Sequence, residues 1–153
     1  MSAVEGRLAA MGLTVHEVVP PVAAYVPAVV SGRHVFTAGQ LPFVDGKLET
    51  TGKVGADVSV ERAAELAATC ALNALAAIKS VTPLDSVVRI VKMTCFVASA
   101  PDFTGQPTVA NGASTLLLEA YGEAGAHARS AVGVAVLPLD APVEVELIVE
   151  LAD

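Results

Sequence analysis

The sequence predicts a two-layer α+β domain, in which two helices cover one face of a mixed sheet. Two amphipathic helical patterns, over residues 59–80 and 107–122, lie between strand patterns, and the chain ends in a strictly alternating run over residues 143–151. A chain of 153 residues suits one domain. We therefore expect residues 1–153 to form a single unit.

The N-terminal stretch is expected to contain one short helix and one strand. Residues 1–12 form an N-terminal extension, in which Ser2 and Gly12 are typical of the two ends of a helix. Residues 13–19 predict a strand. Prolines at positions 20, 21 and 27 then remove backbone donors, so we expect irregular structure around Tyr25.

The stretch before the first long predicted helix contains several turn residues. Ser31-Gly32 predicts a turn, residues 33–38 predict a short strand, and Gly39 ends it. Residues 41–55 are rich in glycine and proline and contain the Asp45-Gly46 pair, which is typical of a hairpin. The glycines are spaced as turn residues and do not predict a phosphate-binding loop.

Apolar spacing predicts both long helices. Ser59 is expected to cap the first, which runs to about Ser80, and a strand over residues 87–98 follows. Pro107 opens the second helix, which closes at Gly122. The predicted core faces consist of Ala63, Leu66, Ala67, Cys70, Ala71, Ala74, Leu75 and Ile78 in the first helix and of Val109, Ala113, Leu116, Leu117 and Ala120 in the second.

The last quarter of the chain carries the strongest strand pattern. Over residues 143–151, Val and Leu alternate with Glu144, Glu146, Ile148 and Glu150, which predicts a half-buried strand. Residues 129–136 form a second β-branched run, and the proline-containing break at 137–142 favours a turn. The two runs predict an antiparallel hairpin that places Arg129 opposite Glu150.

Arg129 allows two interpretations. A cross-strand ion pair with Glu150 would contribute only a few tenths to about 1 kcal/mol. Alternatively, the guanidinium presents its fork to a ligand carboxylate, because arginine makes bidentate hydrogen bonds that lysine cannot copy. The pattern of residues does not choose between these two.

The composition predicts a homo-oligomer and argues against some partners. The chain is 54% hydrophobic and 16% charged, which is more apolar than a small monomer needs. Its net charge is −7 and its nine basic residues are dispersed, which argues against nucleic acid as a partner. No apolar stretch is long enough to span a bilayer, and Glu5 and Arg7 stand where a signal peptide would be apolar. A cytoplasmic location is expected, with no membrane partner.

No metal site is expected. Cys70 and Cys95 stand apart, without C-x-x-C spacing, and are interpreted as small buried hydrophobic residues. His16, His34 and His127 form no ligand spacing, so structural or surface roles are expected for all three. His127 precedes Arg129 by two residues and would lie near a pocket that contains this arginine.

Three segments resemble a known family. They read TAGQLP over residues 37–42, KMTCFV over residues 92–97, and RSAVGVAVLPLDAPVEVE over residues 129–146. In this order they resemble the N-terminal SGQIP-type segment, the central strand and the C-terminal signature of the Rid/YjgF family, the reactive-intermediate enamine and imine deaminases. The resemblance covers most of the chain and points to a longer subgroup.

The resemblance implies a chorismate-mutase-like fold that forms a homotrimer, with the bare sheet face covered and pockets between subunits. It gives Arg129 the role of gripping a substrate carboxylate and Glu144 the role of holding or activating water. Tyr25, Gly39 and Asn111 match residues that face the ligand. Each also has a plain explanation: packing beside prolines, a tight bend, a solvated helix position, and, for Glu144, hydration of an open face.

The chain departs from the family pattern in three places. Many members carry cysteine two residues after the arginine, where this chain has Ala131, so no thiol chemistry is expected there. Tyr25 lacks the usual preceding Gly-Pro, and the segment between Asn111 and Arg129 is slightly longer. These departures bear on substrate preference and on activity itself.

The implied function is hydrolytic deamination of small 2-iminoacids and enamines such as 2-aminoacrylate, giving 2-ketoacids and ammonia, as metabolite damage control. No cofactor or metal is expected, because an imine is already an activated electrophile, and the partner is a small carboxylate-bearing metabolite. One alternative is a non-catalytic, carboxylate-binding or chaperone-like trimer. Another is a ribonuclease or translation inhibitor, which the acidic balance disfavours.

Overall fold

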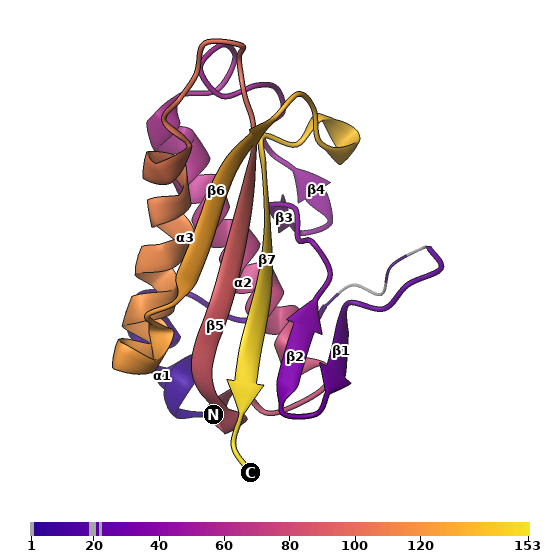
Figure 1. Ribbon diagram of the computed structural model, residues 1–153, viewed down its shortest axis with the longest axis vertical. Coiled ribbons are helices and arrows are strands. Elements are labelled where there is room, and N and C mark those ends of the chain that lie inside the picture. The colour runs from indigo at the N-terminus through magenta and orange to yellow at the C-terminus, as the bar shows by residue number, and fades with distance from the viewer. Residues whose placement is uncertain (1, 19–20, 22) are drawn as a thin grey trace.

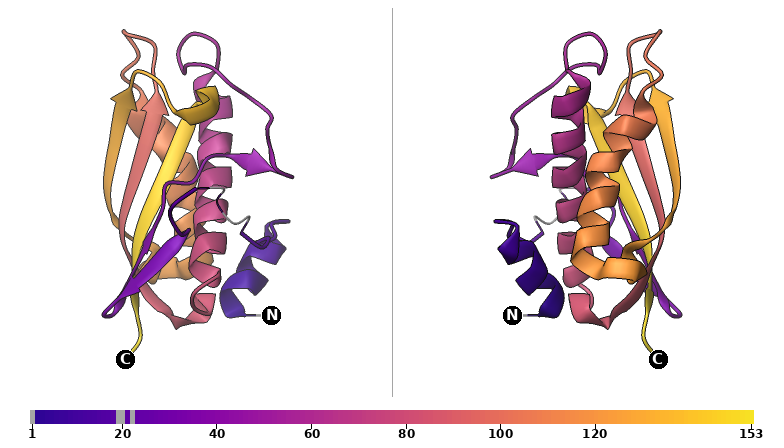
Figure 2. Two further views of the ribbon diagram at one scale, coloured as in Figure 1. Left: turned by 90° about the vertical axis from the view of Figure 1, so that its right-hand side faces the viewer. Right: turned by 90° about the vertical axis from the view of Figure 1, so that its left-hand side faces the viewer.

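The computed structural model describes residues 2–18, 21 and 23–153 and has two layers (Figure 1). A five-stranded sheet forms one layer, and α2 and α3 cover one of its faces (Figure 2). The α+β class, with a mixed sheet, is confirmed. The helices are α1 (Ala3–Ala10), α2 (Val60–Lys79) and α3 (Gln106–Tyr121), and the strands are β1 (Ala28–Ser31), β2 (His34–Thr37), β3 (Phe43–Val44), β4 (Lys47–Leu48), β5 (Val87–Ala98), β6 (Ala128–Val134) and β7 (Val143–Leu151).

The pairing of the last two strands differs from the predicted one. The order is β1-β2-β7-β5-β6, with β5 and β6 parallel and the other pairs antiparallel. The predicted hairpin between the last two strands is therefore wrong, because β5 lies between them. The crossover through α3 brings β6 alongside β5 in parallel, and β7 pairs with the other edge of β5. Arg129 is level with Met93 and not with Glu150.

Small side chains let the two layers approach closely. Gly112 of α3 packs so tightly on α2 that a Cβ at this position would collide with the backbone carbonyl of Ala64. Cys70 and Cys95 are buried free thiols, as interpreted from the sequence. In the two long strands, seven side chains that face the helices are 0–1% exposed: Met93, Cys95 and Val97 in β5 and Val143, Val145, Leu147 and Val149 in β7.

The N-terminal extension folds back onto the helical layer. Ser2 caps α1, as predicted, and accepts a hydrogen bond from the Glu5 amide at 3.1 Å. The Asp85 carboxylate accepts from the first two amides of the helix at 2.8 and 3.0 Å. Arg7 donates to a backbone carbonyl of α3 at 2.6 Å, and Lys79 pairs with Glu5. These contacts fasten α1 to the ends of α2 and α3.

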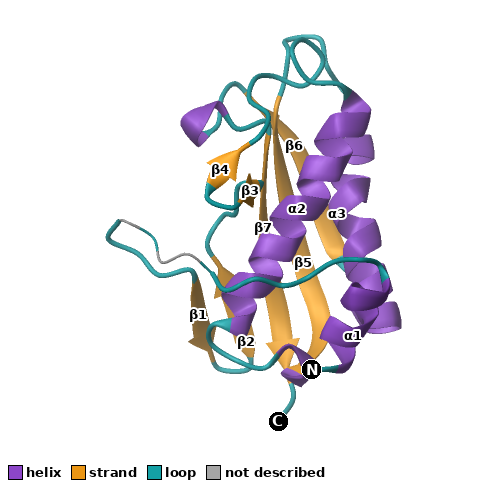
Figure 3. Ribbon diagram, turned by 180° about the vertical axis from the view of Figure 1, so that it is seen from behind, coloured by secondary structure: helices purple, strands orange, loops and turns teal. Residues whose placement is uncertain are grey.

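The strand predicted over residues 13–19 is absent from the described part, residues 13–18, and Val19 lies outside the described residues. Figure 3 shows this segment crossing the outside of α2, where no strand is available for pairing. Leu13 and Val15 pack against the core, which accounts for their apolar character. Around Tyr25 the described residues form no helix or strand, as expected, and Pro20 lies outside them.

The predicted turns are confirmed. Gly32, with φ 59°, connects β1 to β2. Asp45 and Gly46, with φ 50° and 75°, connect β3 to β4 in a separate two-stranded sheet.

No described helix covers the second face of the main sheet, which faces the viewer in Figure 1. Val29, Phe36 and Val132 on this face are 50%, 44% and 42% exposed. They share the face with Glu144 and Glu146, so it is partly apolar and partly acidic. We call it the open face.

No helix among the described residues is long and apolar enough to cross a membrane.

Candidate functional site

Arg129 projects from the edge strand β6 toward the helices. It is level with buried Met93, and residues that are level in a sheet share a face. Its Nη1 donates to Asn111 Oδ1 at 2.7 Å and to Ser114 Oγ at 3.2 Å, both on α3. The fold thus brings together two of the predicted site residues, Arg129 and Asn111.

The ion pair considered for Arg129 does not form. The Glu150 carboxylate lies 3.7 Å from Arg33 and 4.0 Å from Arg89, and it lies beyond β5 from Arg129. Within the described part of the chain, Arg129 pairs with no carboxylate. Both hydrogens of Nη1 have acceptors, whereas Nε and Nη2 donate to no described residue. This free edge has the geometry that holds a planar carboxylate through two parallel hydrogen bonds.

Glu144 projects from β7 onto the open face, where it is level with Phe96 and half-buried. Burial raises the pKa of Glu144 above its ordinary value of 4.5, and the neighbouring Glu146 adds to this effect. A carboxyl group with a raised pKa exchanges protons closer to neutral pH, which suits general acid and base chemistry.

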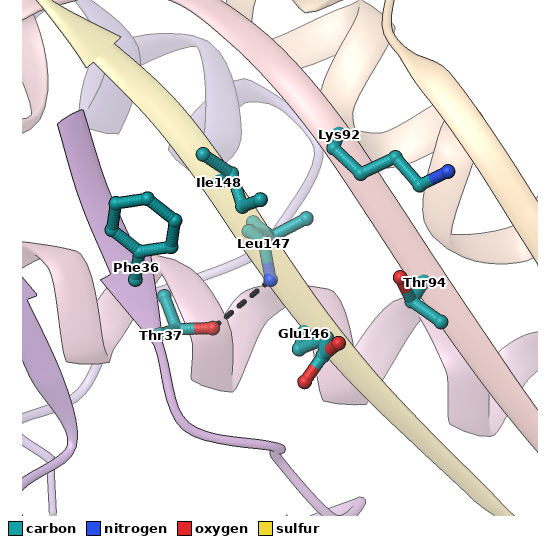
Figure 4. A pocket seen from close by; sticks show the side chains of 7 residues that line it. All are labelled: Phe36, Thr37, Lys92, Thr94, Glu146, Leu147 and Ile148. Carbon is teal, nitrogen blue, oxygen red and sulfur yellow. Dashed lines mark hydrogen bonds between the residues drawn. The ribbon is translucent and has the colours of Figure 1, made fainter.

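Gly39 lies directly against the Glu144 carboxyl group. A Cβ at this position would lie 2.8 Å from Cδ of Glu144, so a larger residue here would displace the Glu144 carboxyl group from this position. The backbone leaves the ladder here: Thr37 Oγ1 accepts from the Leu147 amide at 3.0 Å (Figure 4), and Gln40 resumes backbone pairing with β7 at 2.8 Å. The TAGQ segment therefore brings the Gly39 backbone onto Glu144.

Tyr25 is 57% exposed in the segment before β1. Strands β1 and β6 are the two edges of the sheet, so three strands separate the region of Tyr25 from Arg129. A single chain does not bring these two predicted site residues together.

Arg129 and Glu144 face opposite sides of the sheet. Arg129 is level with Met93, which faces the helices, and Glu144 is level with Phe96, on the open face. Two strand spacings and three residues separate their Cα atoms by roughly 14 Å, at about 4.8 Å per strand and 3.3 Å per residue. One small molecule cannot contact both side chains within a single subunit.

A hollow of about 100 Å³ lies on the open face (Figure 4). Lys92 and Glu146, which both line it, lie on neighbouring strands, and Lys92 Nζ donates to Ser130 Oγ of β6 at 2.9 Å. The lining residues are Phe36, Thr37, Lys92, Thr94, Glu146, Leu147 and Ile148. No pattern in the sequence indicated this hollow. In the part of the chain that the structure describes, no cluster of three His, Cys, Asp or Glu side chains could hold a metal ion.

Two further residues complete the surroundings of Arg129. Ser114, which accepts from the guanidinium, lies 2.9 Å from Nε2 of His127. Ser114 follows Asn111 by three positions on α3, so the two side chains lie on the same face of this helix. His127 precedes Arg129 by two residues, a spacing that places two side chains on the same side of an extended chain. Sequence reasoning noted His127 without giving it a partner and missed Ser114.

Comparison with known proteins gives a consistent result. A family model described as "YjgF/chorismate mutase-like, putative endoribonuclease" matches residues 5–151. The crystal structure of protein Atu1372 from Agrobacterium tumefaciens is 44% identical, with a TM-score of 0.90, and the match covers 99% of this chain and 94% of that one. A Shewanella oneidensis protein is 34% identical, with a TM-score of 0.94, and the match covers 98% of this chain and 100% of that one. Escherichia coli TdcF with bound serine is 27% identical, with a TM-score of 0.63, and the match covers 89% of this chain and 94% of that one.

Proposed function

Because the chain belongs to the YjgF/Rid family, we propose that it hydrolyses small 2-iminoacids, the tautomers of 2-aminoacrylate-type enamines, to 2-ketoacids and ammonia. Members of this family include deaminases. The observation that carries the proposal is the free Nε and Nη2 edge of Arg129, which can grip the carboxylate that every such substrate has.

The open face supports a homotrimer as the active assembly. Apolar side chains such as Phe36 and Val132 are exposed there, and burial between subunits would remove them from water. Because Arg129 and Glu144 face opposite sides of one sheet, they act on one substrate only if they come from different subunits. The proposed pocket therefore lies between neighbours, with Arg129 from one subunit and Glu144 from the next. Gly39, which touches Glu144, belongs to the same half of the pocket, and Tyr25 is proposed to line it.

The proposed chemistry needs one activated water. Arg129 holds the carboxylate while water adds to the C=N carbon and Glu144 accepts a proton from it. Glu144 passes this proton to the nitrogen, and the hydroxyl proton of the resulting carbinolamine follows it. The C–N bond then breaks, ammonia leaves, and the C–O bond becomes the C=O bond of the ketone. General acid and base catalysis of this kind contributes about 10²- to 10⁴-fold. The raised pKa of Glu144 brings its proton exchange closer to neutral pH.

An assay in which a dehydratase generates iminoacids in situ tests the proposal, by following ketoacid release with a chelator present. We expect acceleration by the protein and a loss of roughly 100-fold in kcat/KM for Arg129→Ala, because a charged pair with the substrate is removed. Arg62→Ala, which changes a half-buried arginine of α2 that pairs with Glu49 and Glu65, is the matched control. Unchanged ketoacid release over several side chains, with the protein folded, would refute the reaction.

The second candidate function is carboxylate binding without turnover. It is favoured by TdcF, a relative whose structure contains bound serine, a small carboxylate. In this case the protein would bind pyruvate through Arg129 but would not accelerate ketoacid release.

A further inference from the structure

A hydrogen-bonded chain extends from Arg129 into the turn before β6. Arg129 Nη1 donates to Ser114 Oγ at 3.2 Å, Ser114 Oγ lies 2.9 Å from His127 Nε2, and His127 Nδ1 lies 2.6 Å from the Gly125 carbonyl oxygen. Ser114 and His127 are half-buried, and Gly125 is buried. The proposed reaction has no role for either side chain.

The chemistry of the groups gives the chain a direction. A carbonyl oxygen only accepts, so Nδ1 of His127 carries the hydrogen in this bond. In the neutral ring Nε2 is then an acceptor, and the Ser114 hydroxyl donates to it. The only hydrogen of Ser114 is thereby used, and its lone pairs remain for Arg129.

This arrangement controls the plane of the guanidinium. One hydrogen bond, to Asn111, would still allow the planar group to swing about that contact. A second acceptor on the same helix, for the other Nη1 hydrogen, fixes the plane and leaves the Nε and Nη2 edge without an acceptor among the described residues. A long side chain that is ordered before binding loses less conformational freedom when the ligand arrives.

We propose that Ser114 and His127 are positioning residues for Arg129, which hold its guanidinium ready for a carboxylate without touching the substrate. This inference rests on the proposed role of Arg129 as the carboxylate-binding residue. It predicts weaker binding in the ground and transition states alike, so that KM rises while kcat changes little.

The test measures binding and turnover separately. For Ser114→Ala and for His127→Ala we expect the Kd for pyruvate and the KM for iminoacid to rise about tenfold each, with kcat within about twofold, because one hydrogen bond to a charged group is lost or misdirected. The double variant should bind no more weakly than either single variant, and Ser114→Thr, which keeps the hydroxyl, should bind like the wild type. Thr115→Ala on the exposed side of α3 and His16→Ala are the controls.

A spectroscopic measurement on the wild type needs no variant. Long-range ¹H–¹⁵N spectra of His127 should show the Nδ1–H tautomer, and the side-chain ¹⁵N signals of Arg129 should broaden in Ser114→Ala. The positioning role would be overturned by any one of three results. These are an Nε2–H tautomer of His127, additive losses of binding in the double variant, and an unchanged Kd for pyruvate in the single variants.

The two proposals fail in different ways. If pyruvate binding weakens in the variants but iminoacids are not turned over, the positioning role stands and the reaction falls. If the KM for iminoacid and the Kd for pyruvate are unchanged in Ser114→Ala and His127→Ala while the wild type turns iminoacids over, the reaction stands and the positioning role falls. If the wild type does not bind pyruvate, the carboxylate site and the positioning role both fall.

Discussion

The two faces of the sheet are formed by the same strands but differ in the burial of their side chains. On the helix-covered face, alternate residues of β7 such as Val145 and Leu147 are 0–1% exposed and are covered by the chain itself. On the open face, apolar Phe36 is 44% exposed, and its neighbours include the half-buried carboxyl groups of Glu144 and Glu146. The covered face therefore determines whether a subunit folds. The open face carries features that a lone subunit does not need, which points to assembly and chemistry.

The largest expected effect is on the covered face. Leu147→Ala should lower the free energy of unfolding by about 2–5 kcal/mol, because it leaves a cavity beneath α2. Chemical denaturation checks this, with Leu139→Ala as the control at a residue that is 68% exposed. A loss below about 1 kcal/mol would mean that the core collapses around the gap.

The open face should respond through assembly instead. Phe36→Asp is expected to give a folded monomer, because it places a charge in the proposed subunit interface. Sedimentation equilibrium at micromolar concentration measures the mass, and circular dichroism checks the fold. Leu139→Asp, another exposed apolar position, should remain trimeric. A wild-type chain with the mass of a monomer would contradict the proposed trimer.

Mixed trimers test whether Arg129 of one subunit and Glu144 of its neighbour share one pocket. Arg129→Ala and Glu144→Gln should each be strongly impaired alone, because each removes one half of the proposed pocket. Random mixing of equal amounts pairs an intact arginine with an intact glutamate at about a quarter of the interfaces, so about a quarter of the wild-type activity should return. Verified mixed trimers that remain inactive would exclude this sharing of residues.

The pH dependence separates the roles of the two residues. Glu144 must be ionised to accept a proton, so activity should rise with pH through its pKa, which burial moves above 4.5. Below this pKa the activity should fall about tenfold per pH unit, and the residual activity of Glu144→Gln should lack this limb. An identical acidic limb in Glu144→Gln would assign the titration to another group.

Local patterns predicted the elements well but not their neighbours. Spacings of two and about 3.6 residues located β7, α2 and α3, because they depend only on which side chains are buried. The partner of β6 could not be predicted in this way. A β-branched run has the same residue pattern whether its strand pairs with β7 in a hairpin or with β5 after a crossover helix. The residues 13–18 resemble a strand because they pack on the helical layer, and only the fold reveals this.

The candidate site shows the same division. Arg129, Asn111, Gly39 and Glu144 were selected by residue type and by family resemblance, and the fold brings the first two into contact and places the last two against each other. Their separation onto two faces depends on the register with β5, which no local spacing encodes. The mixed trimers test whether both halves act on one substrate.

The smallest expected effect lies at the edge of the covered side, where α1 is held by acidic groups. A hydrogen bond from Lys79 lowers the pKa of Glu5 to about 2, and hydrogen bonds from the Val4 and Ala3 amides lower the pKa of Asp85. Both pKa values are lower in the folded chain than the ordinary 4.5 of Glu and 3.8 of Asp, so both carboxylates stabilise the fold above their ordinary pKa. The contribution of Glu5 is lost as the pH falls toward about 2, and that of Asp85 is lost as the pH falls through its own lowered pKa.

Acid should therefore loosen α1 before it loosens the sheet. Hydrogen exchange of the α1 amides, corrected for the intrinsic effect of pH, should become on the order of a few-fold less protected between pH 5 and pH 2, because exposed ion pairs and caps contribute modestly. Amides of β7 should keep their protection, and Glu5→Gln should reduce the change in α1. Equal loss of protection in α1 and β7 would mean that the extension unfolds only together with the whole domain.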